Sequence, residues 1–133
     1  MQKTLKLFNK SRIIKKHTIL DYKSSSKAQY LKAKVELKNG DLLFLKEYIS
    51  STEHLYSYHW QKANGDLIIR WDNSPHHKSL ATFPHHKHSP DLEESYETTF
   101  TDVIKAIEKG KIQLTLFLIF PFSQLVVFVK DSE

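Results

Sequence analysis

Apolar and polar residues alternate on both sides of an Asn-Gly dipeptide at residues 39–40, along residues 31–38 and 41–48. This alternation is typical of strands with one buried face. Asn-Gly favours a two-residue type I′ turn, because both central residues of that turn have positive φ. The turn would place Lys38 opposite Asp41, and one face of the hairpin would then be the core face. That face would carry Leu31, Ala33, Val35, Leu37, Leu42 and Phe44.

A second hairpin is predicted over residues 54–62 and 67–72, around the Asn-Gly dipeptide at residues 64–65. With the same type of turn, one face is strongly aromatic and belongs to the core. Its residues are Tyr56, Tyr58, Trp60, Leu67, Ile69 and Trp71. The other face is polar, and there His59 lies directly opposite Arg70.

A strand, a loop and a helix complete the predicted elements. Residues 13–22 are predicted to form a preceding strand. Residues 72–90 contain three prolines and no consistent periodicity, which is typical of a loop. Thr99 can cap a helix over residues 100–109, with Asp102 at its third position. The apolar residues of this helix recur at helical spacing and should pack on the sheet; they are Phe100, Val103, Ile104 and Ile107.

The C-terminal part of the chain is unusually apolar. Gly110 is predicted to end the helix, and residues 112–129 carry no charge. A membrane-spanning helix needs about 20 apolar residues, but Pro121 and several polar residues interrupt this run. Two short strands, at residues 113–120 and 124–130, suit its β-branched and aromatic content better. We therefore expect no membrane partner.

Together these elements predict an α+β fold, in which an antiparallel β-sheet built from hairpins carries a C-terminal helix packed on one face. The 133 residues, 40% of them hydrophobic, suit one domain with one core. We expect this domain to cover residues 1–111, and residues 112–133 to be an apolar extension of the same domain or a surface covered by a partner. There is no cysteine, and the N-terminal segment is too polar for a signal peptide, so a cytoplasmic location is expected.

Positive charge is concentrated at the N-terminal end. Residues 1–38 contain eleven Lys and Arg against two acidic residues, whereas residues 39–133 contain nine against thirteen. Such an asymmetry indicates an anionic partner, most often a nucleic acid. The candidate nucleic-acid-binding residues are Lys15, Lys16, Lys32 and Lys34. The alternative is a solvated lysine-rich surface that protects an edge strand.

Five of the eight histidines lie within thirteen residues; they are His76, His77, His85, His86 and His88. Imidazole titrates near neutral pH, so these five are candidate proton-transfer groups. Arg70 and Lys87 could bind phosphate oxygens, while Asp72 and His59 could orient the histidines. Cleavage of RNA without a metal needs a base for the 2′-hydroxyl, an acid for the leaving 5′-oxygen and a cation for the phosphorane. All three residue types are present in this segment.

Two other interpretations of the same residues stay open. A zinc or nickel site could form through His86 and His88, or through His85 and His88, although their spacing matches no defined metalloenzyme motif. Alternatively, the histidine segment is structural, and the basic strands hold nucleic acid without catalysis. There is no Gly-rich phosphate loop and no GxSxG element, and no cofactor is expected.

Three segments resemble the TumE family of toxin–antitoxin proteins. They read YSYHW at residues 56–60, LIIRWDNSPHH at residues 67–77 and TFPHHKH at residues 82–88, where the family shows YRYH, RYDNAPHH and TFPHHKH in the same order. The resemblance covers about residues 12–109 and departs from the family at Trp71, where Tyr is usual. It implies a small toxin that a co-encoded antitoxin protein neutralises.

From the resemblance and the residues together, we expect the toxin of a type II toxin–antitoxin system. It would act on RNA as a metal-independent ribonuclease-like enzyme. A homodimer is a further candidate assembly.

Overall fold

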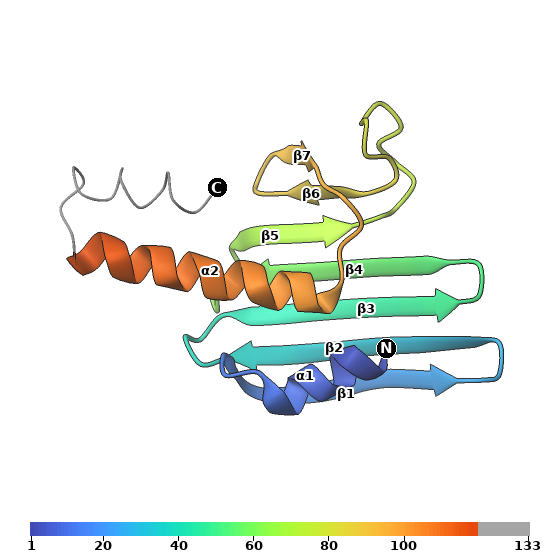
Figure 1. Cartoon of the computed structure of the whole chain (residues 1–133), viewed down its shortest axis with the longest axis horizontal. Helices are drawn as coiled ribbons and strands as arrows, with labels where there is room; N and C mark the ends of the chain where they lie inside the picture. Colours follow the sequence, from blue (N-terminus) through green and yellow to red (C-terminus); the bar gives the residue numbers. More distant parts are fainter. Residues whose placement is uncertain (120–133) are drawn as a thin grey trace. The chain divides into compact units, whose positions relative to one another are not determined.

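The structure is a computed structural model that describes residues 1–119, with side chains described for residues 1–110. Within this range, seven antiparallel strands form one sheet, and each strand pairs with its neighbours in sequence (Figure 1). The strands are β1 (Ile14–Ser24), β2 (Ala28–Leu37), β3 (Leu42–Ser50), β4 (His54–Gln61), β5 (Leu67–Asp72), β6 (His86–His88) and β7 (Leu92–Glu94). The helices are α1 (Gln2–Lys10) and α2 (Phe100–Ile119). The predicted α+β class is confirmed.

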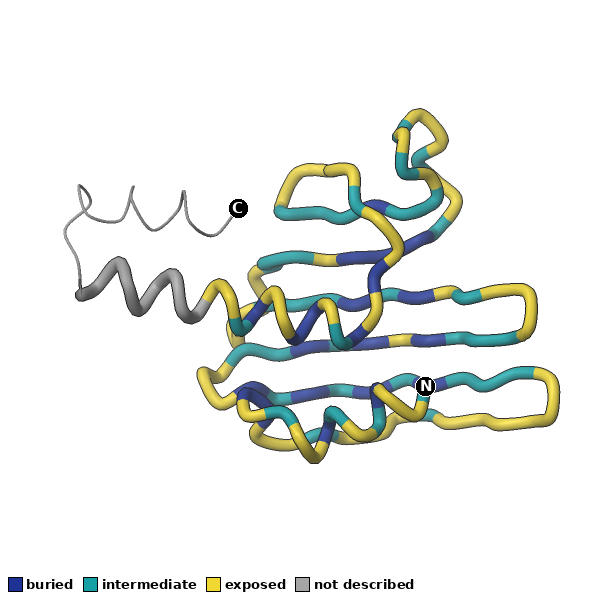
Figure 2. Tube along the Cα trace, viewed as in Figure 1, coloured by how far each residue is buried: buried dark blue, intermediate teal, exposed yellow. Residues whose placement is uncertain are grey.

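Residues 1–103 form one compact unit, which contains α1, the whole sheet and the start of α2; the second unit begins at Ile104. One face of the sheet carries the core of the first unit, and burial alternates along β2 to β4 (Figure 2). The ring of Phe8 in α1 lies 5.6 Å from that of Phe100 and 4.8 Å from that of His17. Tyr58 of β4 lies 6.1 Å from Phe100, so α1 and the first turn of α2 meet on this core face.

The first hairpin has a different turn from the predicted one. The amide of Leu37 donates to the carbonyl of Asp41 at 2.9 Å, which leaves three residues in the loop. Gly40 has a φ of +94°, whereas Asn39 does not have a positive φ. A type I′ turn is therefore excluded, and the loop has the three-residue form in which a glycine takes the left-handed conformation.

This longer loop shifts the strand pairing by one residue. Lys34 pairs with Phe44, and Leu43 and Leu45 are buried on the core face. The prediction that Leu42 and Phe44 face the core was wrong, because a slip of one residue exchanges the two faces of a strand.

The second hairpin has the same three-residue loop, but a β-bulge corrects its pairing. Lys62 donates to Asp66 at 2.9 Å, and Gly65 has a φ of +98°. Farther along, the register shifts between Gln61 and Trp60, so that Ile68 becomes an extra residue in β5. The predicted pairing of His59 with Arg70 is confirmed, although the turn that suggested it was wrong.

The predicted loop, the C-terminal helix and the strand predicted after it also differ from the observed elements. The predicted loop over residues 72–90 contains β6, which pairs with both β5 and β7. Thr99 does cap α2, because its hydroxyl accepts the Asp102 amide at 3.3 Å, while the Asp102 carboxylate accepts the Thr99 amide at 2.8 Å. The helix continues through Gly110 to Ile119, so the predicted helix end and most of the predicted strand over residues 113–120 were wrong.

The predicted strand over residues 124–130 lies outside the described residues. Among the described residues, neither helix is long and apolar enough to cross a membrane.

Candidate functional site

The face of the sheet opposite the core carries two rows of side chains across β2 to β6. Directly paired residues of an antiparallel sheet project from the same face, so the pairing defines each row. The first row consists of Lys34, Phe44, His59, Arg70 and His88. The second row consists of Lys32, Lys46, Ser57, Asp72 and His86. We call this surface the outer face.

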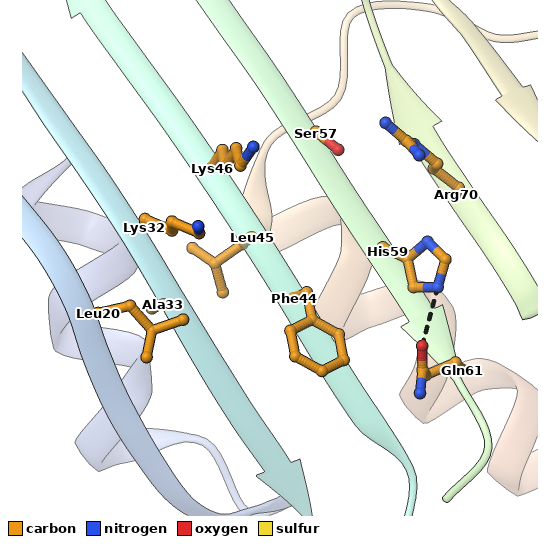
Figure 3. Close-up of a pocket in the computed structure, with 10 residues that line it drawn as sticks. All are labelled: Leu20, Lys32, Ala33, Phe44, Leu45, Lys46, Ser57, His59, Gln61 and Arg70. Atoms are coloured by element: carbon orange, nitrogen blue, oxygen red, sulfur yellow. Dashed lines mark hydrogen bonds between the residues drawn. The ribbon is translucent and has the colours of Figure 1, made fainter. Parts of the chain in front are cut away.

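A groove of about 300 Å³ lies on the outer face. Its lining residues are Leu20, Lys32, Ala33, Phe44, Leu45, Lys46, Ser57, His59, Gln61 and Arg70 (Figure 3). The lining holds three cationic side chains, and none of its ten described residues is acidic. Because a concave cationic surface raises the local concentration of anions, this groove suits a polyanion such as a nucleic acid.

His59 lies in the groove beside Arg70. Its Nε2 donates to the Gln61 side-chain oxygen at 3.1 Å, and Figure 3 shows this contact. Partial burial and the nearby Arg70 guanidinium lower the pKa of His59, and the hydrogen bond to Gln61 partly opposes them. The neutral form is therefore favoured, and its Nδ1 is the nitrogen that can accept a proton.

A buried carboxylate connects Arg70 to the histidines of β6. Asp72 is 4% exposed and accepts from Nε of Arg70 at 3.2 Å. Its other oxygen lies 2.8 Å from Nε2 of His86 and accepts the Ser74 amide at 2.9 Å. Nδ1 of His86 donates to the Pro84 carbonyl at 2.9 Å. Both ring nitrogens of His86 are thus hydrogen bonded, and the imidazole is held in one orientation.

Three imidazoles gather next to this carboxylate. The ring of His77 lies 4.7 Å from that of His86 and 5.7 Å from that of His88, and His86 and His88 are 5.1 Å apart. One nitrogen from each ring lies within 4.8 Å of the others, an arrangement that could hold a transition-metal ion. Burial and the neighbouring His86 lower the pKa of His88; Asp72 opposes this effect, and His77 and Arg70 add to it.

Three of the predicted site residues lie away from this cluster. His76 is exposed in the loop after β5. Nδ1 of His85 is hydrogen bonded to the Tyr56 hydroxyl at 2.8 Å, and the two rings stack at 5.8 Å. Lys87 pairs with Trp71 on the core side of the sheet and forms an ion pair with Glu93 at 3.4 Å. Arg70 and Lys87 therefore project from opposite faces and are not brought together.

The four predicted nucleic-acid-binding lysines also separate. Lys32 lines the groove, and Nζ of Lys34 lies 6.0 Å from the ring centroid of Phe44. Lys16 forms an ion pair with Glu36 at 3.2 Å, and Lys15 is exposed on β1. Neither Lys15 nor Lys16 belongs to the groove lining.

Sequence reasoning missed Phe44, Lys46, Ser57 and Gln61 as groove residues. The correct loop length at residues 38–40 would have placed Phe44 and Lys46 on the outer face with Lys32 and Lys34. Ser57 and Gln61 lie two residues on either side of His59 and so share its predicted polar face, but only the structure shows that this face is concave.

The sequence motif around Asp72 also includes a structural residue. Asn73 is buried, and its side-chain oxygen accepts the Tyr56 amide at 2.9 Å. Its side-chain nitrogen donates to the His54 carbonyl at 2.6 Å. Asn73 therefore ties the end of β5 to the start of β4, which fixes where the histidine segment leaves the sheet.

Comparisons with known proteins agree with the motifs. A family model described as Toxin TumE matches residues 4–111, which span the sheet and both rows of the outer face. No curated protein and no solved structure matches the chain.

Proposed function

Because the chain belongs to the Toxin TumE family and is thus the toxin of a toxin–antitoxin system, we propose that it acts by cleaving RNA. The observation that carries this proposal is the row formed by His59, Arg70 and His88. These residues pair directly across three adjacent strands, so an imidazole lies on each side of a guanidinium. The row runs from the cationic groove to the histidine cluster.

This order matches the needs of RNA cleavage without a metal. Neutral His59 would take the proton of the 2′-hydroxyl as its oxygen attacks the phosphorus. Arg70 would stabilise the charge that develops on the phosphorane oxygens. Protonated His88 would give its proton to the 5′-oxygen as the bond between that oxygen and phosphorus breaks. The products would be a 2′,3′-cyclic phosphate and a 5′-hydroxyl.

Asp72, His86 and His77 would act as positioning residues. Asp72 holds the guanidinium of Arg70 through Nε, which leaves the other two guanidinium nitrogens for phosphate. His86 is fixed by two hydrogen bonds, and its ring packs against those of His77 and His88. Under this proposal His76, His85 and Lys87 take no direct part in the reaction.

The partner of this toxin is an antitoxin. We propose that the antitoxin is a protein, as in a type II system, and that the toxin acts on RNA in the cytoplasm.

A second candidate function is metal-dependent cleavage of RNA. The three imidazole nitrogens of His77, His86 and His88 within 4.8 Å of one another favour it. A bound transition-metal ion would then polarise the phosphate or activate the nucleophile. The hydrogen bonds that already occupy both nitrogens of His86 weigh against it, because one of them would have to break.

The test is cleavage of total RNA by purified protein, with the ends of the products identified. His59→Gln should reduce kcat about 10²- to 10⁴-fold, as expected for loss of a general base. Arg70→Lys should reduce it about 10²- to 10³-fold, because a point charge does not reproduce the guanidinium fork. Arg12→Lys and His54→Gln, which lie outside the outer-face rows, are the matched controls and should cleave like the parent.

Treatment with EDTA separates the two candidates. Cleavage that survives EDTA supports the metal-independent proposal, whereas activity that is lost and then restored by a transition metal supports the second. RNA binding with no cleavage by the parent would refute both and would favour a non-enzymatic toxin.

A further inference from the structure

Phe44 is an aromatic side chain on the outer face, where the strand pattern had suggested a core residue. It lines the groove, and its ring lies 6.3 Å from that of His59 in an edge-on arrangement. Lys34, which pairs with Phe44 from β2, has its ammonium group 6.0 Å from the ring centroid. The Phe44 ring thus lies near a cation and an imidazole, in a groove that contains lysines. Such an aromatic ring is a suitable surface for stacking a nucleobase.

The position of Phe44 relative to the proposed reaction site is specific. Phe44, His59, Arg70 and His88 follow one another in a single row over β3, β4, β5 and β6. Neighbouring strands lie about 4.8 Å apart, so Phe44 and Arg70 are separated by roughly 10 Å, with His59 between them. A nucleotide presents its base, its ribose 2′-hydroxyl and its 3′-phosphate in the same order.

We propose that the groove binds single-stranded RNA. The base that precedes the cleaved bond stacks on Phe44, and the RNA strand runs from β3 towards β6 in its 5′ to 3′ direction. This inference rests on the proposed function, because the order of groups is read from the cleavage site. Lys32 and Lys46 lie in the neighbouring row next to Phe44 and would hold the phosphate on the 5′ side of the stacked base. A base-paired nucleotide cannot stack in this way, since both of its faces are already covered in the duplex.

Binding can be measured separately from cleavage. The probe is a fluorescent single-stranded RNA that carries a 2′-deoxy nucleotide at the mapped cleavage position, so it binds but is not cut. Phe44→Leu keeps an apolar side chain but removes the ring, and should weaken binding about fivefold to a hundredfold, as expected for the loss of one stacked base. Tyr96→Leu removes a ring that is 85% exposed outside the groove lining, and should bind like the parent.

An abasic site in the probe tests which base is stacked. Removing the base on the 5′ side of the cleavage position should weaken binding to the parent by a similar factor and should have little further effect on Phe44→Leu. Removing the base on the 3′ side should have little effect on either protein. The same sequence as a duplex should bind at least tenfold more weakly.

The two proposals fail in different ways. If RNA is cleaved but Phe44→Leu binds the probe as tightly as the parent, the stacking proposal is wrong and the cleavage proposal stands. If the abasic site on the 3′ side is the harmful one, the proposed strand direction is wrong. If the parent cleaves no RNA, the cleavage proposal fails; loss of affinity in Phe44→Leu towards an uncut oligonucleotide would then support the stacking site alone.

Discussion

At the scale of single residues, the chemistry of the outer face depends on how each imidazole is surrounded. His59 faces a guanidinium and a side-chain amide, whereas His86 faces a carboxylate and a backbone carbonyl. The first environment favours a neutral ring with one open nitrogen. The second holds both nitrogens and fixes the ring. Two histidines with the same intrinsic chemistry are therefore suited to different tasks, one to proton transfer and the other to positioning.

The lowered pKa of His59 predicts how cleavage depends on pH. A general base works in its neutral form and a general acid in its protonated form, so kcat/KM should rise as His59 loses its proton and fall as His88 loses its own. The profile is therefore bell-shaped, and its rising limb has a midpoint below the ordinary value of 6.5. Burial of the His59 ring, the Gln61 side chain on β4 and the Arg70 guanidinium on β5 set this midpoint. The measurement is kcat/KM for a single-stranded RNA across pH 4.5 to 8.

An NMR titration of the His59 ring assigns this midpoint. Arg70→Gln should raise the pKa of His59, because it removes a nearby positive charge. Gln61→Leu should lower it further, because the acceptor that favours the charged ring is lost. A midpoint at or above 6.5 in the parent, or no change in Arg70→Gln, would contradict the lowered pKa of His59. A kcat/KM midpoint that does not follow the pKa of the His59 ring would show that His59 is not the base.

At the scale of elements, strand register decides which residues reach the site. Both hairpins have the same three-residue loop, which the dipeptide Asn-Gly does not distinguish from a two-residue turn. In the second hairpin the extra residue Ile68 restores the predicted pairing, so the opposition of His59 and Arg70 could be predicted. In the first hairpin the register shift persists along β3, so Leu42 and Phe44 were placed on the wrong face.

Two elements, β6 and α1, were not predicted from the sequence. β6 is only three residues long and lies among prolines, and it exists because it pairs with β5 and β7, which local patterning cannot reveal. In α1 the buried residues are Thr4 and Phe8, and Leu5 lies on the same side at helical spacing, so the segment is amphipathic.

The contact between α1 and the core predicts a large effect on stability. Phe8 is 4% exposed and packs against both Phe100 and His17. Phe8→Ala should lower the free energy of unfolding by about 3–5 kcal/mol, through lost burial and the cavity that remains. Urea unfolding followed by tryptophan fluorescence measures it. Tyr96→Ala, at 85% exposure, is the matched control and should change the free energy by less than about 0.5 kcal/mol. A small effect of Phe8→Ala would mean that α1 is not docked on the sheet.

At the scale of the whole molecule, the folded chain divides the N-terminal charge into separate groups. The sequence shows only that residues 1–38 are rich in lysine and arginine. The structure distributes these residues over α1, β1 and β2, so most of them lie away from the groove. Lys32 contributes to the groove together with Lys46 and Arg70, which come from the less basic part of the chain. The predicted anionic partner therefore fits a surface built from both parts of the chain, rather than a basic N-terminal tail.

This division predicts which lysines control the salt dependence of RNA binding. Each phosphate contact on a single strand contributes about −0.7 to the slope of log K against log salt concentration. Lys32→Gln/Lys46→Gln should therefore flatten the slope by about 1.4 and weaken binding most at low salt. Lys15→Gln/Lys16→Gln removes the same formal charge from β1, where Lys16 is already paired with Glu36, and should leave the slope almost unchanged. Fluorescence anisotropy with an uncut single-stranded RNA at 50 to 300 mM salt measures both. Equal flattening by the two double variants would mean that binding follows total charge and that the groove has no special role.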